Sequence, residues 1–436
     1  MTITDDTNNG TSSELGYTPA EPLPINSDPK RVLFAYVKNP NSTYTHTLKS
    51  PPLKNNNRYW VPNVSGGLVI SQIPQKTSWD LPSNIRYART AEAHGFEYAL
   101  TQIRFTAAYG AAHQHESITL SQALLHHTMR LKVIAAILPG PLTPVVVAKQ
   151  IASIDNYTNG RVAVNIVSGW NKSEFTAIGE WWLEHAERYR RSNEFIQCLR
   201  GIWTAGEEGE GEGAQGFSFS GDFYRFHNYK LNPKPLQKPH PEIFQGGNSD
   251  DARNNGAEVS DWYFMNGNDL EGFREQIADV KARAVKAGRG PDAVRFAVNG
   301  FVIVRDTEEE AFHVLRDIQG KADTAAVSAF ASAVKQAGAS TSNKRGMWAD
   351  SKAADLVQYN DGFKTKLIGT KEQVADRILL LKSLGVGLVL TAFLHYEEEV
   401  EQFGREVLPL VRRLEGEGRG RDVDDEVERS GWVYEK

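Results

Sequence analysis

The chain has 436 residues, 40% of them hydrophobic, and a formal net charge of -5 at pH 7; this allows a large core and offers no basic footprint for nucleic acid. Its single cysteine excludes an internal disulfide framework and suits a reducing compartment. The opening residues MTITDDTNNGTSSELG carry neither an apolar signal core nor an arginine-rich pattern, and the longest apolar runs have the length of strands. We therefore expect a soluble cytoplasmic protein that does not span a membrane.

Residues 1–30 are rich in Asn, Thr, Ser, Asp and Pro, which predicts a disordered N-terminal arm. After this arm, short apolar runs alternate with amphipathic stretches. The runs predict strands that are buried on both faces, at 31–37, 96–103, 131–138, 161–169, 241–247, 261–267, 294–306 and 386–394. The stretches predict helices at 83–94, 117–128, 143–157, 187–203, 249–258, 269–288, 307–335, 371–384 and 397–413.

Eight strands with interleaved helices predict a (β/α)8 TIM barrel over residues 31–414. A doubly wound open sheet is the alternative, but no strand runs into the G-x-G-x-x-G turn that is typical of that fold. Four segments do not fit the repeat. They are a polar insert at 37–59, an acidic linker at 205–216, a long segment at 320–366 that we expect to be a lid, and a charged, disordered tail at 415–436.

Two neighbouring strand ends combine glycine with a hydroxyl group. Ser168 and Gly169 follow the fourth strand, and Gly247, Asn248 and Ser249 follow the fifth. Free backbone N–H groups and a helix dipole at such corners favour an anion. Ordinary helix capping by Asn248 or Ser249 is the alternative explanation. Because both corners lie at the same end of a parallel barrel, they suggest one shared phosphate site.

Other polar residues near strand ends are less specific. The spacing of His113 and His115 can bind a metal, but the later strands supply no further ligands, so we expect hydrogen bonding or loop structure there. Arg104 is costly to bury alone, so it either pairs with an acid or faces an anion. Cys198 lies on an apolar helix stripe and is expected to be a packing thiol. His395 is either a helix-start residue or an active-site donor.

These residues belong to longer stretches that resemble the bacterial-luciferase-like flavin monooxygenases. Within that family the chain is most similar to the FMNH2-dependent dimethyl sulfone monooxygenases. The matching stretches cover most of residues 60–413. They include WVPNVSGGLVISQI (60–73), GFEYALTQIRFTAAYGAAHQHES (95–117), RVAVNIVSGW (161–170) and PEIFQGGNSDDAR (241–253).

The resemblance implies a barrel that binds FMN, as FMNH2, at its carboxyl-terminal face and uses O2 as co-substrate. The flavin-binding residues that it implies are Gln102, Ala136, Asn165, Ser168, Gly169, Tyr189, Gly247, Asn248 and Ser249. The catalytic residues that it implies are His395, Arg104, Asn63 and Trp60, and Trp348 and Tyr359 belong to the expected lid. No metal is implied.

The implied reaction cleaves a C–S bond in sulfur scavenging, converting dimethyl sulfone to methanesulfinate and formaldehyde. The related alkanesulfonate monooxygenases carry a cysteine at Thr106, a tyrosine at Phe393 and a histidine near Val64, so the departures favour an uncharged substrate. An alkanesulfonate monooxygenase, a flavin-binding protein without turnover and a deazaflavin reductase remain as alternatives. The implied partners are a separate NAD(P)H-dependent flavin reductase and other copies of the chain, as a dimer or tetramer.

One departure from the family affects the first strand. The related enzymes run FAY directly into WVPN, whereas residues 37–59 interrupt that sequence here. Either a loop has been inserted at the barrel mouth, or the reading frame includes non-coding sequence. The second explanation is favoured, because an insertion within a central strand should disrupt its hydrogen-bond ladder.

Overall fold

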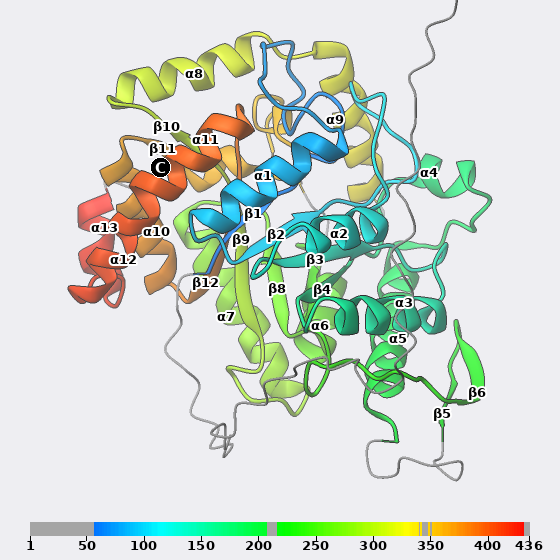
Figure 1. Cartoon of the computed structure of the whole chain (residues 1–436). Coiled ribbons are helices and arrows are strands. Elements are labelled where there is room, and N and C mark those ends of the chain that lie inside the picture. The colour runs from blue at the N-terminus through cyan, green and yellow to red at the C-terminus, as the bar shows by residue number, and fades with distance from the viewer. Residues whose placement is uncertain (1–55, 207–215, 340, 342–347, 349–350, 431–436) are drawn as a thin grey trace, which may run out of the picture. The chain divides into compact units, whose positions relative to one another are not determined.

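The computed structural model describes residues 56–206, 216–339, 341, 348 and 351–430. Eight parallel strands close into a barrel, which confirms the predicted (β/α)8 fold (Figure 1). Around the barrel they are β1 (Asn56–Trp60), β2 (Tyr98–Thr101), β3 (Lys132–Ile137), β4 (Val162–Ile166), β7 (Ile243–Gly246), β8 (Trp262–Met265), β9 (Arg295–Phe301) and β12 (Val386–Ala392). Strands β3, β4 and β12 are almost wholly buried on both faces, as their apolar sequences require.

Helices between the strands surround the barrel. They are α1 (Leu81–Ala93), α2 (Ser117–His126), α3 (Pro144–Tyr157), α5 (His185–Thr204), α6 (Asp250–Val259), α7 (Leu270–Lys286) and α10 (Lys371–Ser383), followed after β12 by α11 (Tyr396–Gln402), the π-helix η3 (Phe403–Val407) and α12 (Leu408–Gly416). Several begin at side-chain caps that the sequence supplies. Asp80 accepts from the Ser83 N–H at the start of α1, and Thr370 forms a capping box with Gln373 at the start of α10. None of the described helices combines the length and apolar composition needed to cross a membrane.

The first strand is not where the sequence pattern placed it. The prediction put it at 31–37, which lies outside the described residues, whereas Asn56–Trp60 occupies the place between β2 and β12. The pattern failed here because Asn56, Asn57 and Arg58 are polar and do not suggest a buried strand. Residues 56–59 of the expected insert are therefore part of the barrel, and its remainder lies outside the described residues.

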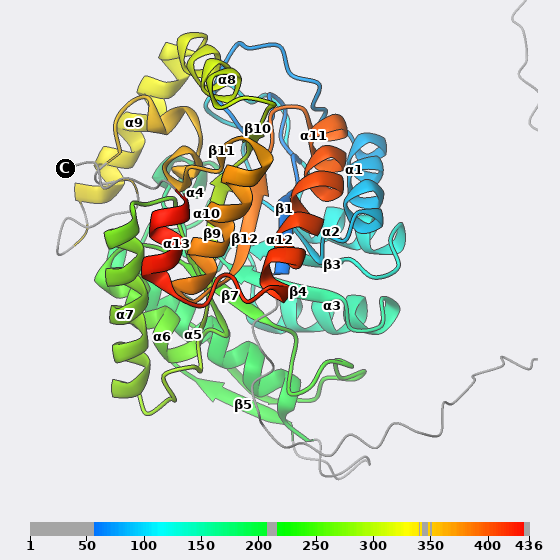
Figure 2. The ribbon, with the colours of Figure 1, turned by 90° about the vertical axis from the view of Figure 1, so that its left-hand side faces the viewer.

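Further elements extend the two ends of the barrel. After β9, the segment forms β10 (Ile303–Val304), α8 (Glu308–Gly320), α9 (Thr324–Ala339), the 3-10 helices η1 (Asp355–Val357) and η2 (Gly362–Thr365), and β11 (Ile368–Gly369). The predicted helix at 307–335 is thus two helices. The short helix α4 (Lys172–Ala177) follows β4. The antiparallel hairpin of β5 (Phe217–Ser220) and β6 (Arg225–Tyr229) lies at the opposite end from α8 and α9 (Figures 1 and 2).

The expectation of disorder at the C-terminal end is wrong for residues up to Ser430. Helix α13 (Val423–Ser430) packs against α10. Arg419 donates to Glu426 at 2.6 and 2.7 Å and to Asp376 at 2.9 Å, and Glu426 is 1% exposed. The charged side chains that suggested a solvated tail instead form ion pairs with one another and with α10. Residues 1–30, the linker residues 207–215 and residues 431–436 lie outside the described part of the chain.

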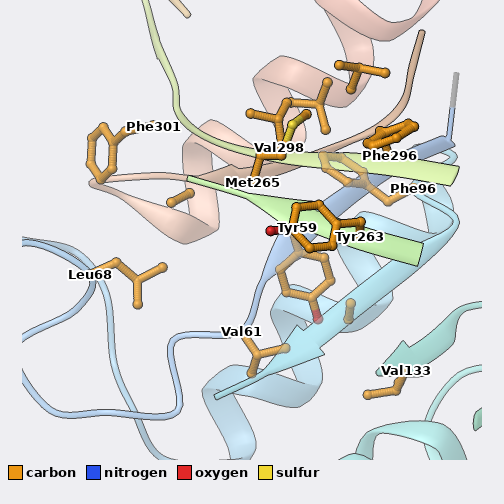
Figure 3. Close-up of a cluster of buried hydrophobic side chains, with 14 of the residues drawn as sticks. Tyr59, Val61, Leu68, Phe96, Val133, Tyr263, Met265, Phe296, Val298 and Phe301 are labelled. Carbon is orange, nitrogen blue, oxygen red and sulfur yellow. The ribbon is translucent and has the colours of Figure 1, made fainter. Parts of the chain in front are cut away.

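The core has two layers. Between barrel and helices, Tyr59 packs edge to face on Phe96, within the cluster of side chains in Figure 3. Inside the barrel, a smaller cluster includes Tyr98, Phe244 and Trp262. The guanidinium of Arg58 lies among these three rings, 3.6, 4.7 and 4.7 Å from their centroids.

Candidate functional site

A cavity of about 230 Å³ opens at the carboxyl ends of the barrel strands. Its walls bring together all the predicted site residues except Asn63 and His395: Trp60, Gln102, Arg104, Ala136, Asn165, Ser168, Gly169, Tyr189, Gly247, Asn248 and Ser249. The shared location follows from topology, since all carboxyl ends of a parallel barrel face the same side.

One end of the cavity has the features of an anion site. Ser249 caps α6 by accepting from the Ala252 N–H at 3.2 Å, so the N-terminus of this ten-residue helix faces the corner that follows β7. Ser168, at the neighbouring strand end, accepts a hydrogen bond from the Ser192 hydroxyl at 2.8 Å. The capping explanation for Ser249 is therefore correct, but it does not exclude anion binding, because the cap leaves other N–H groups of the first turn free of helical partners.

Helix α5 adds a cation to this end. Arg188 is 2% exposed, and its Nε and Nη1 donate to the carbonyls of Gly169 and Leu183 at 3.0 and 2.7 Å. Its guanidinium also lies 4.1 Å from the centre of the Trp182 ring. Burial lowers the pKa of Arg188 to about 10, which still leaves it charged at neutral pH. A fixed positive charge beside a helix N-terminus is suited to a phosphate group.

Gly247 allows the backbone to approach this corner closely. Its φ is +144°, and a Cβ would lie 2.6 Å from the Ala252 Cβ and 2.8 Å from the Tyr189 hydroxyl oxygen. Gly169 has φ +90°, and a Cβ there would lie 2.7 Å from the Phe175 ring. Both positions therefore require glycine. Burial raises the pKa of Tyr189 to about 12, so its hydroxyl keeps its proton.

The two carboxylates in the first turn of α6 have hydrogen-bonding partners on other helices. Asp250 pairs with Arg283 at 2.8 Å, and Asp251 lies 2.9 Å from Nδ1 of His185. Burial lowers the pKa of His185, so at neutral pH its ring is neutral and Nδ1–H donates to Asp251. These contacts reduce the repulsion that two carboxylates would exert on a bound phosphate.

The middle of the cavity is formed by the ends of β2, β3 and β4. Ala136 pairs with Asn165 across β3 and β4, and both line the cavity with Gln102. Asn63, just after β1, is hydrogen-bonded to this region. Its Nδ2 donates to the carbonyls of Gln102 and His115, each at 3.0 Å, and its Oδ1 accepts from the Gln102 N–H at 3.1 Å. The amide of Asn63 is thus committed to holding the strand ends together, and among the described residues it is not a cavity wall.

His395 is also separate from the cavity. It occupies the N-cap position of α11, where its Nδ1 accepts from the Lys76 N–H at 3.1 Å and its own N–H donates to Glu399 at 3.0 Å. Within the described part of the chain, the lining does not include it. His395 therefore stands at a helix start, although its side chain does not cap the helix.

Five aromatic side chains close the other end: Tyr109, Trp170, Phe330, Trp348 and Tyr359. The Phe330 ring lies 5.2–5.6 Å from the other four, and the Tyr359 hydroxyl donates to the Tyr109 carbonyl at 3.2 Å. The expected lid segment at 320–366 supplies three of them, including Trp348 and Tyr359. Arg104 lies 4.4 Å above the Trp170 ring and 3.4 Å from Glu174.

Several buried polar atoms of the lining have no hydrogen-bond partner among the described residues. Four are donors, and the fifth is an acceptor: Trp60 Nε1, Gln102 Nε2, Asn266 Nδ2, Trp348 Nε1 and Asn299 Oδ1. Buried donors without partners are unfavourable, so this set fits a bound group that is rich in oxygen acceptors.

The two histidines considered for a metal lie elsewhere. His113 and His115 flank Trp79, with ring centroids 4.8 and 4.9 Å away. The described residues contain no cluster of three or more His, Cys, Asp or Glu side chains that could hold a metal ion. Cys198 is fully buried, and burial raises its pKa to about 12, as expected for a packing thiol.

Sequence reasoning missed several lining residues. His185 and Arg188 share a helix face with the predicted Tyr189, and their i, i+3, i+4 spacing was a usable signal. Asn266 directly follows β8 and was visible in the sequence as a polar residue at a strand end, whereas Phe330, on α9, had no comparable signal.

Comparison with known proteins agrees with this geometry. The family model for luciferase-like monooxygenases matches residues 64–387. The chain belongs to the luciferase-like monooxygenase family. It is 62% identical over 361 residues to an FMNH2-dependent dimethylsulfone monooxygenase of Pseudomonas putida, an alignment that covers 83% of this chain and 96% of that protein.

Two further similarities agree with this membership. A protein of the same description from Pseudomonas fluorescens (strain Pf0-1) is 60% identical, with 83% of this chain and 95% of that one covered. Among solved structures, a riboflavin lyase crystallised with modified FMN and riboflavin superposes with a TM-score of 0.73 at 18% identity, covering 87% of this chain and 96% of that one. At that identity the structure supports the fold alone.

Proposed function

We propose that this protein is an FMNH2-dependent monooxygenase that converts dimethyl sulfone to methanesulfinate and formaldehyde. The observation that carries the proposal is the 60–62% identity to two proteins described as FMNH2-dependent dimethylsulfone monooxygenases, over at least 95% of their lengths. The overall reaction consumes one FMNH2 and one O2 per sulfone. One oxygen atom enters the products, the other leaves as water, and oxidised FMN is released.

The cavity residues fit FMN. Its phosphate would lie between Arg188, the α6 N-terminus and the Ser168–Gly169 corner, where Gly247 provides a close backbone approach. Gln102, Ala136 and Asn165 form the wall along which the rest of the flavin would lie, and the unpaired Gln102 amide is a donor for a flavin oxygen. When bound in reduced form, FMN supplies the electrons that activate O2.

The protein's own contribution is binding, orientation and exclusion of water. A sulfone carries two oxygen acceptors and no donor, which complements the unpaired N–H groups of Trp60 and Trp348 in the lining. The aromatic walls exclude water, so the donors act in a low-dielectric environment. Asn63 is a positioning residue, since it fixes the backbone that carries Gln102.

Three further features are part of the proposal. A separate NAD(P)H-dependent flavin reductase supplies the FMNH2, because the reaction consumes one per turnover. A cytoplasmic location is consistent with that supply and with the single buried cysteine. The chain works as a homo-oligomer, either a dimer or a tetramer.

The function is tested by product analysis with purified protein, a flavin reductase, NADH, FMN and O2. Dimethyl sulfone should yield equal amounts of formaldehyde and methanesulfinate, and methanesulfonate should yield far less product. Turnover of methanesulfonate in preference to the sulfone would instead favour the alkanesulfonate alternative, for which Arg104 in the lining is the supporting observation. Absence of product with both substrates, despite flavin binding, would support the alternative without turnover.

A further inference from the structure

Arg104 is the cation at the aromatic end of the cavity. It lies 4.4 Å above the Trp170 ring, and its side chain is 17% exposed. A partly buried guanidinium in a small cavity would normally attract anions. An alkanesulfonate is such an anion, and it differs from a sulfone mainly in having a charged oxygen in place of a methyl group.

Glu174 opposes that attraction. Its Oε2 lies 3.4 Å from Nη1 of Arg104, and its side chain is 5% exposed. The carboxylate is held in place by the backbone, because its Oε1 accepts from the Phe105 N–H at 2.6 Å and from the Thr106 N–H at 3.4 Å. Its position is therefore fixed independently of whatever occupies the cavity.

Among the residues that the structure describes, the neighbouring walls add no compensating charge. Burial raises the pKa of Tyr109, and it raises that of Tyr359 to about 12, so both hydroxyls stay neutral. The other described cationic lining residue, Arg188, is at the α5 end beside the proposed phosphate corner. An anion at the aromatic end would thus meet Arg104 and Glu174 together, at close to zero net charge.

We infer that Glu174 is a specificity-determining residue, which neutralises Arg104 so that the cavity accepts uncharged sulfones and rejects alkanesulfonate anions. The inference rests on the proposed function. Glu174 does not take part in the chemistry: it removes the net positive charge that would otherwise favour an anionic substrate over a neutral one.

The test is the variant Glu174→Gln. The amide oxygen still accepts from the Phe105 N–H, so the loop cap is retained, while the negative charge is removed. Methanesulfonate is then used as a competitive inhibitor of dimethyl sulfone turnover. Its inhibition constant should fall about tenfold to hundredfold, the range expected when one ionic hydrogen bond becomes available. The KM for dimethyl sulfone should change by less than about threefold, because a neutral ligand gains no such bond.

Glu180→Gln is the matched control. Glu180 pairs with Arg191 at 3.0 Å, and neither residue is part of the described lining. This variant should leave methanesulfonate inhibition unchanged. In the double variant Arg104→Met/Glu174→Gln the inhibition constant of methanesulfonate should return to about its wild-type value. This would identify Arg104 as the cation that binds the anion. If Glu174→Gln does not fold, Glu174→Asp withdraws the carboxylate by one methylene and should shift the inhibition constant in the same direction.

The inference is overturned if a folded variant binds FMN normally but shows the same methanesulfonate inhibition as the wild type. It is also overturned if Glu180→Gln gives the same gain. Failure of the proposed function has a different signature, namely no formaldehyde from dimethyl sulfone with the wild-type protein. In that case methanesulfonate is titrated directly, with Trp fluorescence as the readout, and the predicted affinity ratio between variant and wild type still decides the inference.

Discussion

Replacing Arg58 with Met should stabilise the barrel. Arg58 is fully buried, and its three guanidinium nitrogens have no hydrogen-bond partner among the described residues. Burial lowers its pKa to about 10, and the charged form is nevertheless the one present at neutral pH. Methionine has a similar length and packs well against aromatic rings such as Tyr98 and Trp262. The substitution therefore removes a buried, poorly compensated charge and keeps the interior filled.

The magnitude follows from opposing contributions. Each buried polar group without a hydrogen bond costs about 1–3 kcal/mol. Stacking of the guanidinium on aromatic rings offsets up to ~2 kcal/mol of this cost. Electrostatic attraction to Glu242 offsets a further part of it. Replacement of buried ion pairs by well-packed apolar side chains is often neutral or stabilises proteins by about 1–4 kcal/mol. We expect Arg58→Met to fall in that range.

The assay is urea denaturation followed by Trp fluorescence and circular dichroism. Arg58→Met should raise the midpoint at an unchanged slope. The control Arg253→Met should lower it, because Arg253 donates to Glu275 and Asp279 at 2.7 and 2.9 Å. A midpoint for Arg58→Met equal to or below the wild-type value would show that the buried charge does not destabilise the barrel.

Deletion of residues 37–59 makes the same change by another route. Joining Tyr36 to Trp60 puts Tyr36 in the place of Tyr59 and Ala35 in the place of Arg58. The shortened chain should have a higher denaturation midpoint and retain FMN binding. A lower midpoint would favour a genuine insertion over translated non-coding sequence.

Three further predictions concern the site and its surroundings. Ser249→Asp should weaken FMN binding at least about tenfold through repulsion of the phosphate, with Ser249→Ala as control; unchanged affinity in a flavin titration would remove this corner from the site. His395→Ala should lower the thermal midpoint and leave kcat within about threefold, because the histidine lies away from the described lining; a large kcat loss in a folded variant would make it catalytic. Burial raises the pKa of Asp361 from 3.8 to about 6, so its ionisation in the folded protein opposes stability as pH rises from 4 to 6. The free energy of unfolding of Asp361→Asn, relative to that of the wild type, should therefore rise by up to about 2–3 kcal/mol between pH 4 and pH 6. A constant difference in thermal midpoint from pH 4 to 7 would contradict this.

The barrel and the meeting of the Ser168 and Ser249 corners in one cavity could be predicted from the sequence because local signals define them. Continuous apolar runs identify strands buried on both faces, and glycine next to a hydroxyl at a strand end marks a tight turn into a helix. Ser168 and Ser249 are 81 positions apart, but parallel topology brings the ends of β4 and β7 together. No contact between distant residues had to be known in advance.

The remaining features depend on contacts that local patterns do not encode. The partner of Arg104 could be described only as an acid or an anion, and Glu174, 70 residues away, carries no mark that identifies it. The strand assignment missed β1 because its sequence is polar. A charged side chain such as Arg58 is normally exposed, so nothing in the sequence suggested that it is buried inside a barrel. The charged segment after residue 415 looked solvated, yet Glu426 is buried by pairing with Arg419.

The proposed activity requires the cavity at the strand ends to use reduced FMN and O2 to oxidise a neutral sulfone. The most direct measurement is a single turnover, in which protein loaded anaerobically with FMNH2 is mixed with O2 and excess dimethyl sulfone. Close to one formaldehyde and one methanesulfinate should form for each FMN oxidised, with little hydrogen peroxide. Stoichiometric hydrogen peroxide without formaldehyde would contradict the proposed activity.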